Sequence, residues 1–234
     1  MKIIIDQPAL RRRASLAHTA SLGGLLVLLG SVALSLWQPT WSAISTLLLI
    51  AGFATSVAGI AYANRWVKRP RPEQVLGQSL KGLSDQHRLY HYTRLGEHLL
   101  LTPNSLVAIE TVPLEGLFTY KDGRWKQKLS ISRATRFFVE ERLGDPIQRA
   151  QSSAAAVMEY IEEGLPAGTQ FPVQAVVVFT HPFARVQADS PPAPVIPPEK
   201  LVKKLPRPAA KLDAAVYQHA RECLDALLPG APAA

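Results

Sequence analysis

Two glutamates, Glu97 and Glu110, are the residues of this 234-residue sequence whose type and spacing best support chemistry. They bracket two apolar, β-prone stretches, Glu97–Leu101 and Leu106–Thr111, with Pro103-Asn104 as the turn between them. If those two residues form the tip of a hairpin, Glu97 lies directly opposite Glu110. Like charges in that position are unfavourable on a sheet unless the two carboxylates share a proton or a cation.

Close carboxylates share either a proton or a cation. A third acid, Glu73, stands near the start of a predicted helix and could join them. Oxygen-rich sites suit Mg²⁺ or Mn²⁺, which activate water and stabilise transferring phosphoryl groups. The residues alone leave two alternatives open. Glu97 and Glu110 could be exposed on a slipped register, and Glu73 could merely favour the helix dipole at its N-terminus.

The segment Gly96–Val112 resembles the central hairpin of the nuclease-related domain (NERD) family. That pattern runs as an acid followed by histidine, three apolar residues, a Pro-Asn-type turn, an apolar strand and then Glu-Thr-Lys. The resemblance extends over about residues 73–205. Its weaker parts are the Pro72-Glu73 helix start, Gly116, the Asp122-Gly123-Arg124-Trp125 hairpin and the helix start at Asp145-Pro146-Ile147-Gln148-Arg149-Ala150.

The family belongs with the PD-(D/E)XK nuclease-like fold, so the resemblance implies a restriction-endonuclease-like mixed sheet flanked by helices. It also implies that Glu73, Glu97 and Glu110 occupy the acidic metal-site positions. Gln148 would be the helix glutamine of the site, acting with Glu97 and Glu110 in catalysis. Mg²⁺ or Mn²⁺ would be the cofactor and nucleic acid the partner.

Two residues depart from the family pattern. Glu97 stands where the pattern usually has aspartate, which keeps the charge and lengthens the arm. Val112 stands where the pattern has lysine, on the same strand face as Glu110. A valine cannot orient water or stabilise developing charge. Lys121, Lys126 or Lys128 on the next hairpin could supply the cation instead, or all three could simply be solvated.

These observations lead to a first interpretation and two rivals. The first is a membrane-anchored protein whose degenerate nuclease-related domain is a binding or scaffolding module without efficient cleavage. The second is a metal-dependent nuclease with a relocated lysine, acting on nucleic acid near the membrane. The third is a membrane protein whose soluble part only supports assembly. The sequence contains no phosphate loop, dinucleotide fingerprint, Gly-x-Ser-x-Gly elbow or His-Glu-x-x-His motif.

The order of predicted elements after residue 72 is a helix, strands, a helix and strands, which indicates an α/β sandwich on a mixed sheet. The helices are expected over residues 73–84, 146–163 and 209–228. The strands are expected over residues 87–93, 97–101, 106–111, 117–120, 125–131, 173–179 and 184–188.

Residues 1–71 have a different composition and predict a transmembrane hairpin. No formal charge lies between Ala14 and Asn64, where two apolar runs occupy about residues 17–37 and 42–63. Each is long enough to cross the roughly 30 Å hydrocarbon core as a helix. Pro39 lies in the short turn between them, so the two spans must be antiparallel.

The basic residues flank the outer ends of this hairpin. Residues 1–71 hold eight basic groups and one acid, whereas residues 72–234 hold 18 basic and 17 acidic groups. Because the turn carries no basic residue, both termini are expected in the cytoplasm. The alternative, a cleaved signal peptide ending near Trp41-Ser42-Ala43, requires a shorter apolar core than this one.

Overall fold

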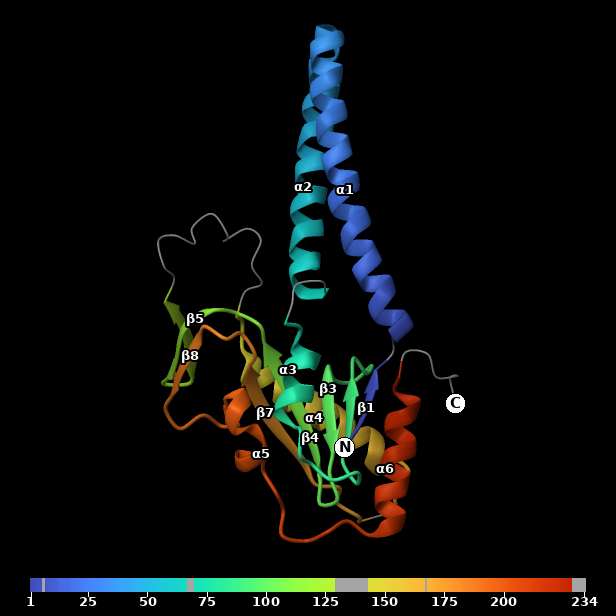
Figure 1. Cartoon of the computed structure of the whole chain (residues 1–234), viewed down its shortest axis with the longest axis vertical. Coiled ribbons are helices and arrows are strands. Elements are labelled where there is room, and N and C mark those ends of the chain that lie inside the picture. Colours follow the sequence, from blue (N-terminus) through green and yellow to red (C-terminus); the bar gives the residue numbers. More distant parts are fainter. Residues whose placement is uncertain (6, 67–69, 129–142, 167, 229–234) are drawn as a thin grey trace. The chain divides into compact units, whose positions relative to one another are not determined.

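The computed structural model describes residues 1–5, 7–66, 70–128, 143–166 and 168–228. It divides into two compact units (Figure 1). One contains Met1–Asp6, Pro72–Leu129 and Leu143–Ala234, and the other contains Gln7–Arg71. We refer to them as the sheet unit and the hairpin unit.

The hairpin unit consists of two long apolar helices, as expected. Helix α1 spans Gln7–Trp37 and helix α2 spans Ser42–Trp66, joined by the short 3₁₀ helix η1 at Pro39–Trp41. Both are long and apolar enough to cross a membrane. Large side chains such as Leu36 and Trp37, 80% and 84% exposed, cover their surfaces. Such a continuous apolar surface is typical of helices that face lipid.

Small residues set the separation of α1 and α2. A Cβ atom at Gly59 would collide with the backbone of Ser21, and one at Gly52 would lie 2.9 Å from the backbone nitrogen of Leu28. Close backbone approach over small residues is the usual packing mode of helices in lipid.

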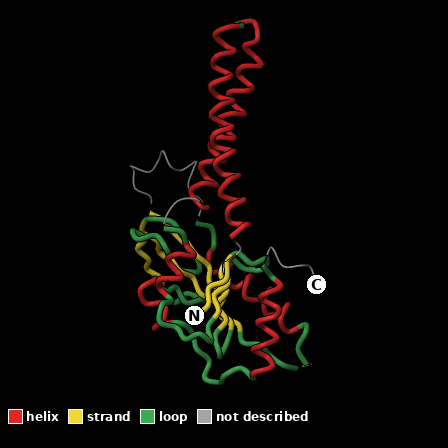
Figure 2. The backbone as a smooth tube through the Cα atoms, turned by 45° about the vertical axis from the view of Figure 1, so that its right-hand side comes forward, coloured by secondary structure: helices red, strands yellow, loops and turns green. Residues whose placement is uncertain are grey.

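The sheet unit is a mixed α/β fold, with its strands in yellow and its helices in red in Figure 2. Its five-stranded sheet has the order β1-β2-β3-β4-β7. Its strands are β1 (Lys2–Ile5), β2 (Arg88–His91), β3 (His98–Leu101), β4 (Leu106–Val112) and β7 (Val173–Phe179). A second sheet has the order β6-β5-β8, from β5 (Gly116–Lys121), β6 (Arg124–Lys128) and β8 (Ala184–Ala188). The helices are α3 (Pro72–Ser79), α4 (Pro146–Glu162), η3 (Pro198–Lys200), α5 (Leu201–Lys204) and α6 (Ala214–Ala226).

Helices cover both faces of the five-stranded sheet. Strand alternation sends Leu99 and Leu101 to one face, where they pack with α4 and α6. It sends Leu100 to the other face, where it packs with α3 and α5. This two-sided burial explains why β3 is fully buried and reads as a continuous apolar run.

The predicted hairpins form with the predicted register. Leu101 pairs with Leu106 and His98 with Ile109, which confirms the turn at Pro103-Asn104. In the second hairpin Asp122 and Gly123 have φ values of +53° and +75°. Positive φ at both central residues defines a type I′ turn, for which Asp-Gly is the favoured pair.

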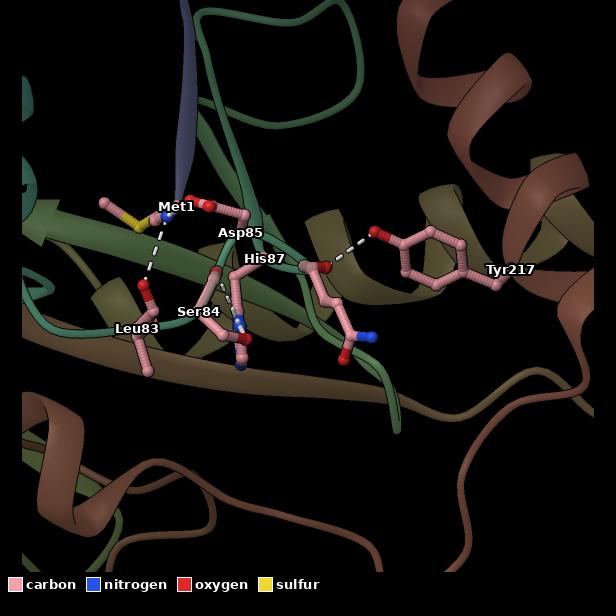
Figure 3. A network of polar contacts seen from close by, with 7 residues as sticks. Met1, Leu83, Ser84, Asp85, His87 and Tyr217 are labelled. Atoms are coloured by element: carbon pink, nitrogen blue, oxygen red, sulfur yellow. Dashed lines mark hydrogen bonds and ion pairs between the residues drawn. The ribbon is translucent and has the colours of Figure 1, made fainter.

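The sequence did not predict strand β1. Residues Lys2–Ile5 pair in parallel with β2 and extend the sheet of the C-terminal part, although the hairpin separates them from it in sequence. The Met1 amine donates to Leu83 O at 3.1 Å and to Asp85 Oδ1 at 2.9 Å, which lowers the pKa of Asp85 (Figure 3). A four-residue run gives too weak a local signal, because only its pairing with β2 defines it as a strand.

Two helices are shorter than predicted. Helix α3 ends at Ser79 and is followed by turns that include Gly82 at φ +101°. Helix α6 begins at Ala214, because the Asp213 side chain caps it by accepting from the backbone nitrogen of Ala215. The hydrophobic periodicity alone revealed neither the end of α3 nor the beginning of α6.

Candidate functional site

The site is a cavity of about 240 Å³ that both Glu97 and Glu110 line. Extending the register by one residue past the His98–Ile109 pair places the two glutamates opposite each other. They have the same strand parity as Leu99 and Ala108, so they lie on the sheet face covered by α4, whose Ala150 and Ser153 also line the cavity.

A tight turn after β2 positions Glu97. The Thr93 hydroxyl donates to Gly96 O at 2.6 Å and accepts from Gly96 N at 3.1 Å. Ser153 on α4 donates to Leu95 O at 2.9 Å. A Cβ atom at Gly96 would collide with the Ser153 hydroxyl, so only glycine allows the turn to lie this close to the helix.

Arg149 is the side chain that α4 supplies to Glu110. Its Nε lies 2.5 Å from Glu110 Oε1 and its guanidinium also donates to Leu143 O at 3.1 Å. The Glu110 carboxyl side chain is only 13% exposed, whereas that of Arg149 is 47% exposed. Asp145 fixes the start of α4 by accepting from the backbone nitrogens of Ile147 and Gln148. The Arg149 guanidinium therefore balances the negative charge of the Glu110 carboxylate.

Gln148, which the family resemblance places in the site, is exposed and does not line the cavity. The neighbouring residue Arg149 contacts Glu110 in its place. Sequence reasoning missed Arg149, although it follows Gln148 directly, because the exact rotation of α4 over the sheet decides which of the two reaches the strand.

Glu73 is buried in the first turn of α3 and is bound by another residue, Tyr92. The Tyr92 hydroxyl donates to Glu73 Oε2 at 2.6 Å. Helix α3 packs on the sheet face opposite to α4, and Glu73 is not among the residues that line the cavity of Glu97 and Glu110. Tyr92 has φ +61°, a left-handed conformation that costs a non-glycine residue roughly 1–2 kcal/mol.

A buried histidine pair lies beside Tyr92. His91 Nδ1 is 2.8 Å from His98 Nδ1, so one ring donates to the other. Both rings are essentially inaccessible to solvent. Burial first, and the charge of His98 second, lower the pKa of His91 to about 2. The strand register creates this pair, because it places His91 of β2 directly opposite His98 of β3.

We predict that this pair makes the protein acid-sensitive. The folded-state pKa of His91 lies below its unfolded value, so the unfolded chain binds the proton first as the pH falls. The contribution of the neutral His91 ring to the free energy of unfolding is full above about pH 6.5 and decreases below that pH. Between pH 6.5 and 5 the free energy of unfolding should fall by about 2 kcal/mol from this group.

Thermal unfolding of the full chain in detergent at several pH values measures this decline. His91→Phe combined with His98→Leu should flatten it, since the double variant leaves neither ring behind. An equally steep decline in the double variant would contradict the assignment to this pair.

Val112 is buried, 2% exposed, in an apolar cluster with Phe118, Ile147 and Phe179. It lies two residues beyond Glu110 on the same strand face, as predicted. The position that carries lysine in the family pattern is therefore part of the hydrophobic core.

The three lysines considered as replacements do not line the cavity. Lys121, Lys126 and Lys128 are exposed on the β5–β6 hairpin. The opposite face of that hairpin carries Tyr120 and Trp125 into the apolar cluster around Val112. The lysines therefore lie on the outer side of the second sheet.

The Arg149 guanidinium competes with any divalent cation for the acids of this cavity. Two carboxylates line the cavity, and the Arg149 guanidinium occupies one of them. Within the described ranges, no three His, Cys, Asp or Glu side chains lie close enough together to hold a metal. Mg²⁺ and Mn²⁺ can be held by one or two carboxylates together with water and substrate oxygens, so the guanidinium on Glu110, rather than the number of acids, disfavours a bound cation here.

The fold and site together define a mixed α/β domain with a cavity, lined by Glu97, Glu110 and Arg94, between a β-hairpin and a helix. Residues 70–180 match the family model of the nuclease-related domain. The chain therefore carries a nuclease-related domain, which confirms the resemblance of the Gly96–Val112 hairpin. None of the curated proteins and none of the solved structures compared with the chain gives a match.

Proposed function

We propose that this protein is a membrane-anchored binding module whose nuclease-related domain does not cleave nucleic acid efficiently. The observation that carries the proposal is the chemistry around Glu110. An arginine neutralises its carboxylate, and the valine two residues further on replaces the expected cation with buried hydrocarbon. A charge-stabilising group of this kind contributes on the order of 10²–10³ in rate.

Arg149 offers a direct test of this proposal. We expect the full chain to bind Mn²⁺ weakly, because the metal must displace the guanidinium from Glu110. Arg149→Ala should strengthen Mn²⁺ binding in calorimetric titration, and Arg149→Ala with Glu110→Gln should abolish the gain. Tight Mn²⁺ binding by the unmodified chain would contradict the proposal and favour the rival metal-dependent nuclease.

The proposed anchor is the hairpin unit, with both of its ends on one side of the membrane. Strand β1 supports this orientation because it precedes α1 yet pairs with β2, which follows α2. A strand and its sheet must lie in the same compartment. The basic residues outside both spans favour the cytoplasm as that compartment.

Cysteine labelling in intact cells measures this topology. In a Cys223→Ser background, Thr40→Cys should react with a membrane-impermeant maleimide, because Thr40 lies in the turn between the spans. Lys211→Cys, also exposed but on the sheet unit, should react only after the cells are permeabilised. Reaction of Lys211→Cys in intact cells would overturn the orientation.

A further inference from the structure

The second sheet has a strongly basic outer face. Five exposed cations lie on its three strands, and those strands contain no acidic residue. We call this set the basic sheet face, and it consists of Lys121, Arg124, Lys126, Lys128 and Arg185.

Strand alternation produces this face. Along β6, the exposed residues Arg124, Lys126 and Lys128 alternate with Trp125 and Gln127, which are partly buried. Strand register places side chains of the neighbouring strands beside them. Lys128 and Arg185 both pair with Leu117, and Lys126 pairs with Thr119. The cations therefore lie side by side across three strands.

This concentration contrasts with the rest of the sheet unit. Residues 72–234 hold 18 basic and 17 acidic groups, so the unit as a whole is close to neutral. Five of its basic groups nevertheless share one flat face. Such a face attracts an anionic surface, although the net charge alone does not predict that.

The basic sheet face lies beyond one end of the five-stranded sheet. At this same end the chain leaves β1 for helix α1 and returns from helix α2 into α3. Strands β1, β2, β4 and β7 all run in the same direction. The second sheet continues from the C-terminal ends of β4 and β7. Strand β1 ends at Ile5 on that side, and Glu73, one residue after α3 begins, bonds to Tyr92 just beyond the end of β2.

The connections from these points to the helices are short. One residue separates Ile5 from Gln7, and five residues separate Trp66 from Pro72. Five extended residues span at most about 18 Å. If the hairpin crosses a bilayer, this end of the sheet unit stays within reach of the lipid headgroups.

We propose that the basic sheet face docks on the anionic lipid headgroups of the membrane that holds the hairpin. This inference rests on the membrane anchor of the proposed function. The tether keeps the sheet unit at a high effective concentration near the surface, so modest attraction suffices. Each Lys or Arg near an anionic leaflet strengthens association about fivefold. Phe183, 72% exposed immediately before β8, adds an aromatic ring beside the charges.

Hydrogen–deuterium exchange of the full chain in nanodiscs tests this docking. In discs of phosphatidylcholine with one-quarter phosphatidylglycerol, the peptides covering β5, β6 and β8 should exchange more slowly than in pure phosphatidylcholine. The added protection should disappear in 0.5 M NaCl. It should also disappear in the Lys126→Gln, Lys128→Gln, Arg185→Gln variant, whose docking equilibrium is weakened about a hundredfold.

A matched control neutralises three other exposed lysines of the same unit. Lys200→Gln, Lys203→Gln and Lys204→Gln remove the same charge around α5 and should keep the protection. Equal exchange in both kinds of disc would overturn the docking. Protection that requires an added DNA oligonucleotide would also overturn it and assign the face to nucleic acid. Labelling of Thr40→Cys and Lys211→Cys, both outside the basic sheet face, reports separately on whether the anchor itself is wrong.

Discussion

Replacing Val112 with lysine is expected to destabilise the protein by about 3–5 kcal/mol, the cost of a buried charge without a partner. Val112 is 2% exposed and packs with Phe118, Ile147 and Phe179. The nearest acid on its strand face, Glu110, already pairs with Arg149. The midpoint of thermal unfolding should fall by roughly 10 °C.

The matched control is Val112→Met, which changes the size of the side chain and adds no charge. It should cost about 1–3 kcal/mol, the usual cost of a larger apolar side chain in a packed core. A Val112→Lys variant as stable as Val112→Met would contradict the account. It would show that Glu110 can accept the new ammonium, so that a working nuclease-type site lies one substitution away.

A charge introduced into strand β1 should also destabilise the protein strongly. Ile4 packs against the core cluster that contains Leu99 and Leu101. Ile4→Asp places a carboxylate against these apolar side chains, and we expect a loss of about 3 kcal/mol. The cost arises only if β1 belongs to the sheet, so the variant tests the strand that the sequence did not predict.

Ile3→Asp is the control, because it makes the same change at the neighbouring position, which is 46% exposed. It should cost clearly less than Ile4→Asp in thermal unfolding of the full chain. Equal and small effects at both positions would show that residues 2–5 are not part of the sheet.

Much of this fold was accessible from the sequence because local signals and long-range pairing agree. The Pro103-Asn104 turn, together with the alternation on either side of it, fixes the β3–β4 register, and through it the opposition of Glu97 and Glu110. The Asp122-Gly123 pair likewise specifies its own hairpin. Strand β7 was predictable because its buried part, residues 176–179, is a continuous apolar run.

The remaining features depend on contacts between elements far apart in the chain. The Arg149–Glu110 pair depends on how α4 is rotated over the sheet, and the sequence does not encode that rotation locally. The Tyr92–Glu73 bond joins a strained residue after β2 to the start of α3. Only the three-dimensional arrangement reveals that Tyr92 binds Glu73 and that Arg149 binds Glu110.

The rate of DNA cleavage under single-turnover conditions shows most directly whether the nuclease-related domain is an efficient nuclease. The full chain in detergent, in excess over labelled single- and double-stranded DNA, is supplied with Mg²⁺ or Mn²⁺. Glu110→Ala, purified in the same way, reports contaminating nuclease. We predict that the two preparations cleave at the same background rate. Robust cleavage by the unmodified chain that Glu110→Ala abolishes would contradict the account and establish a metal-dependent nuclease.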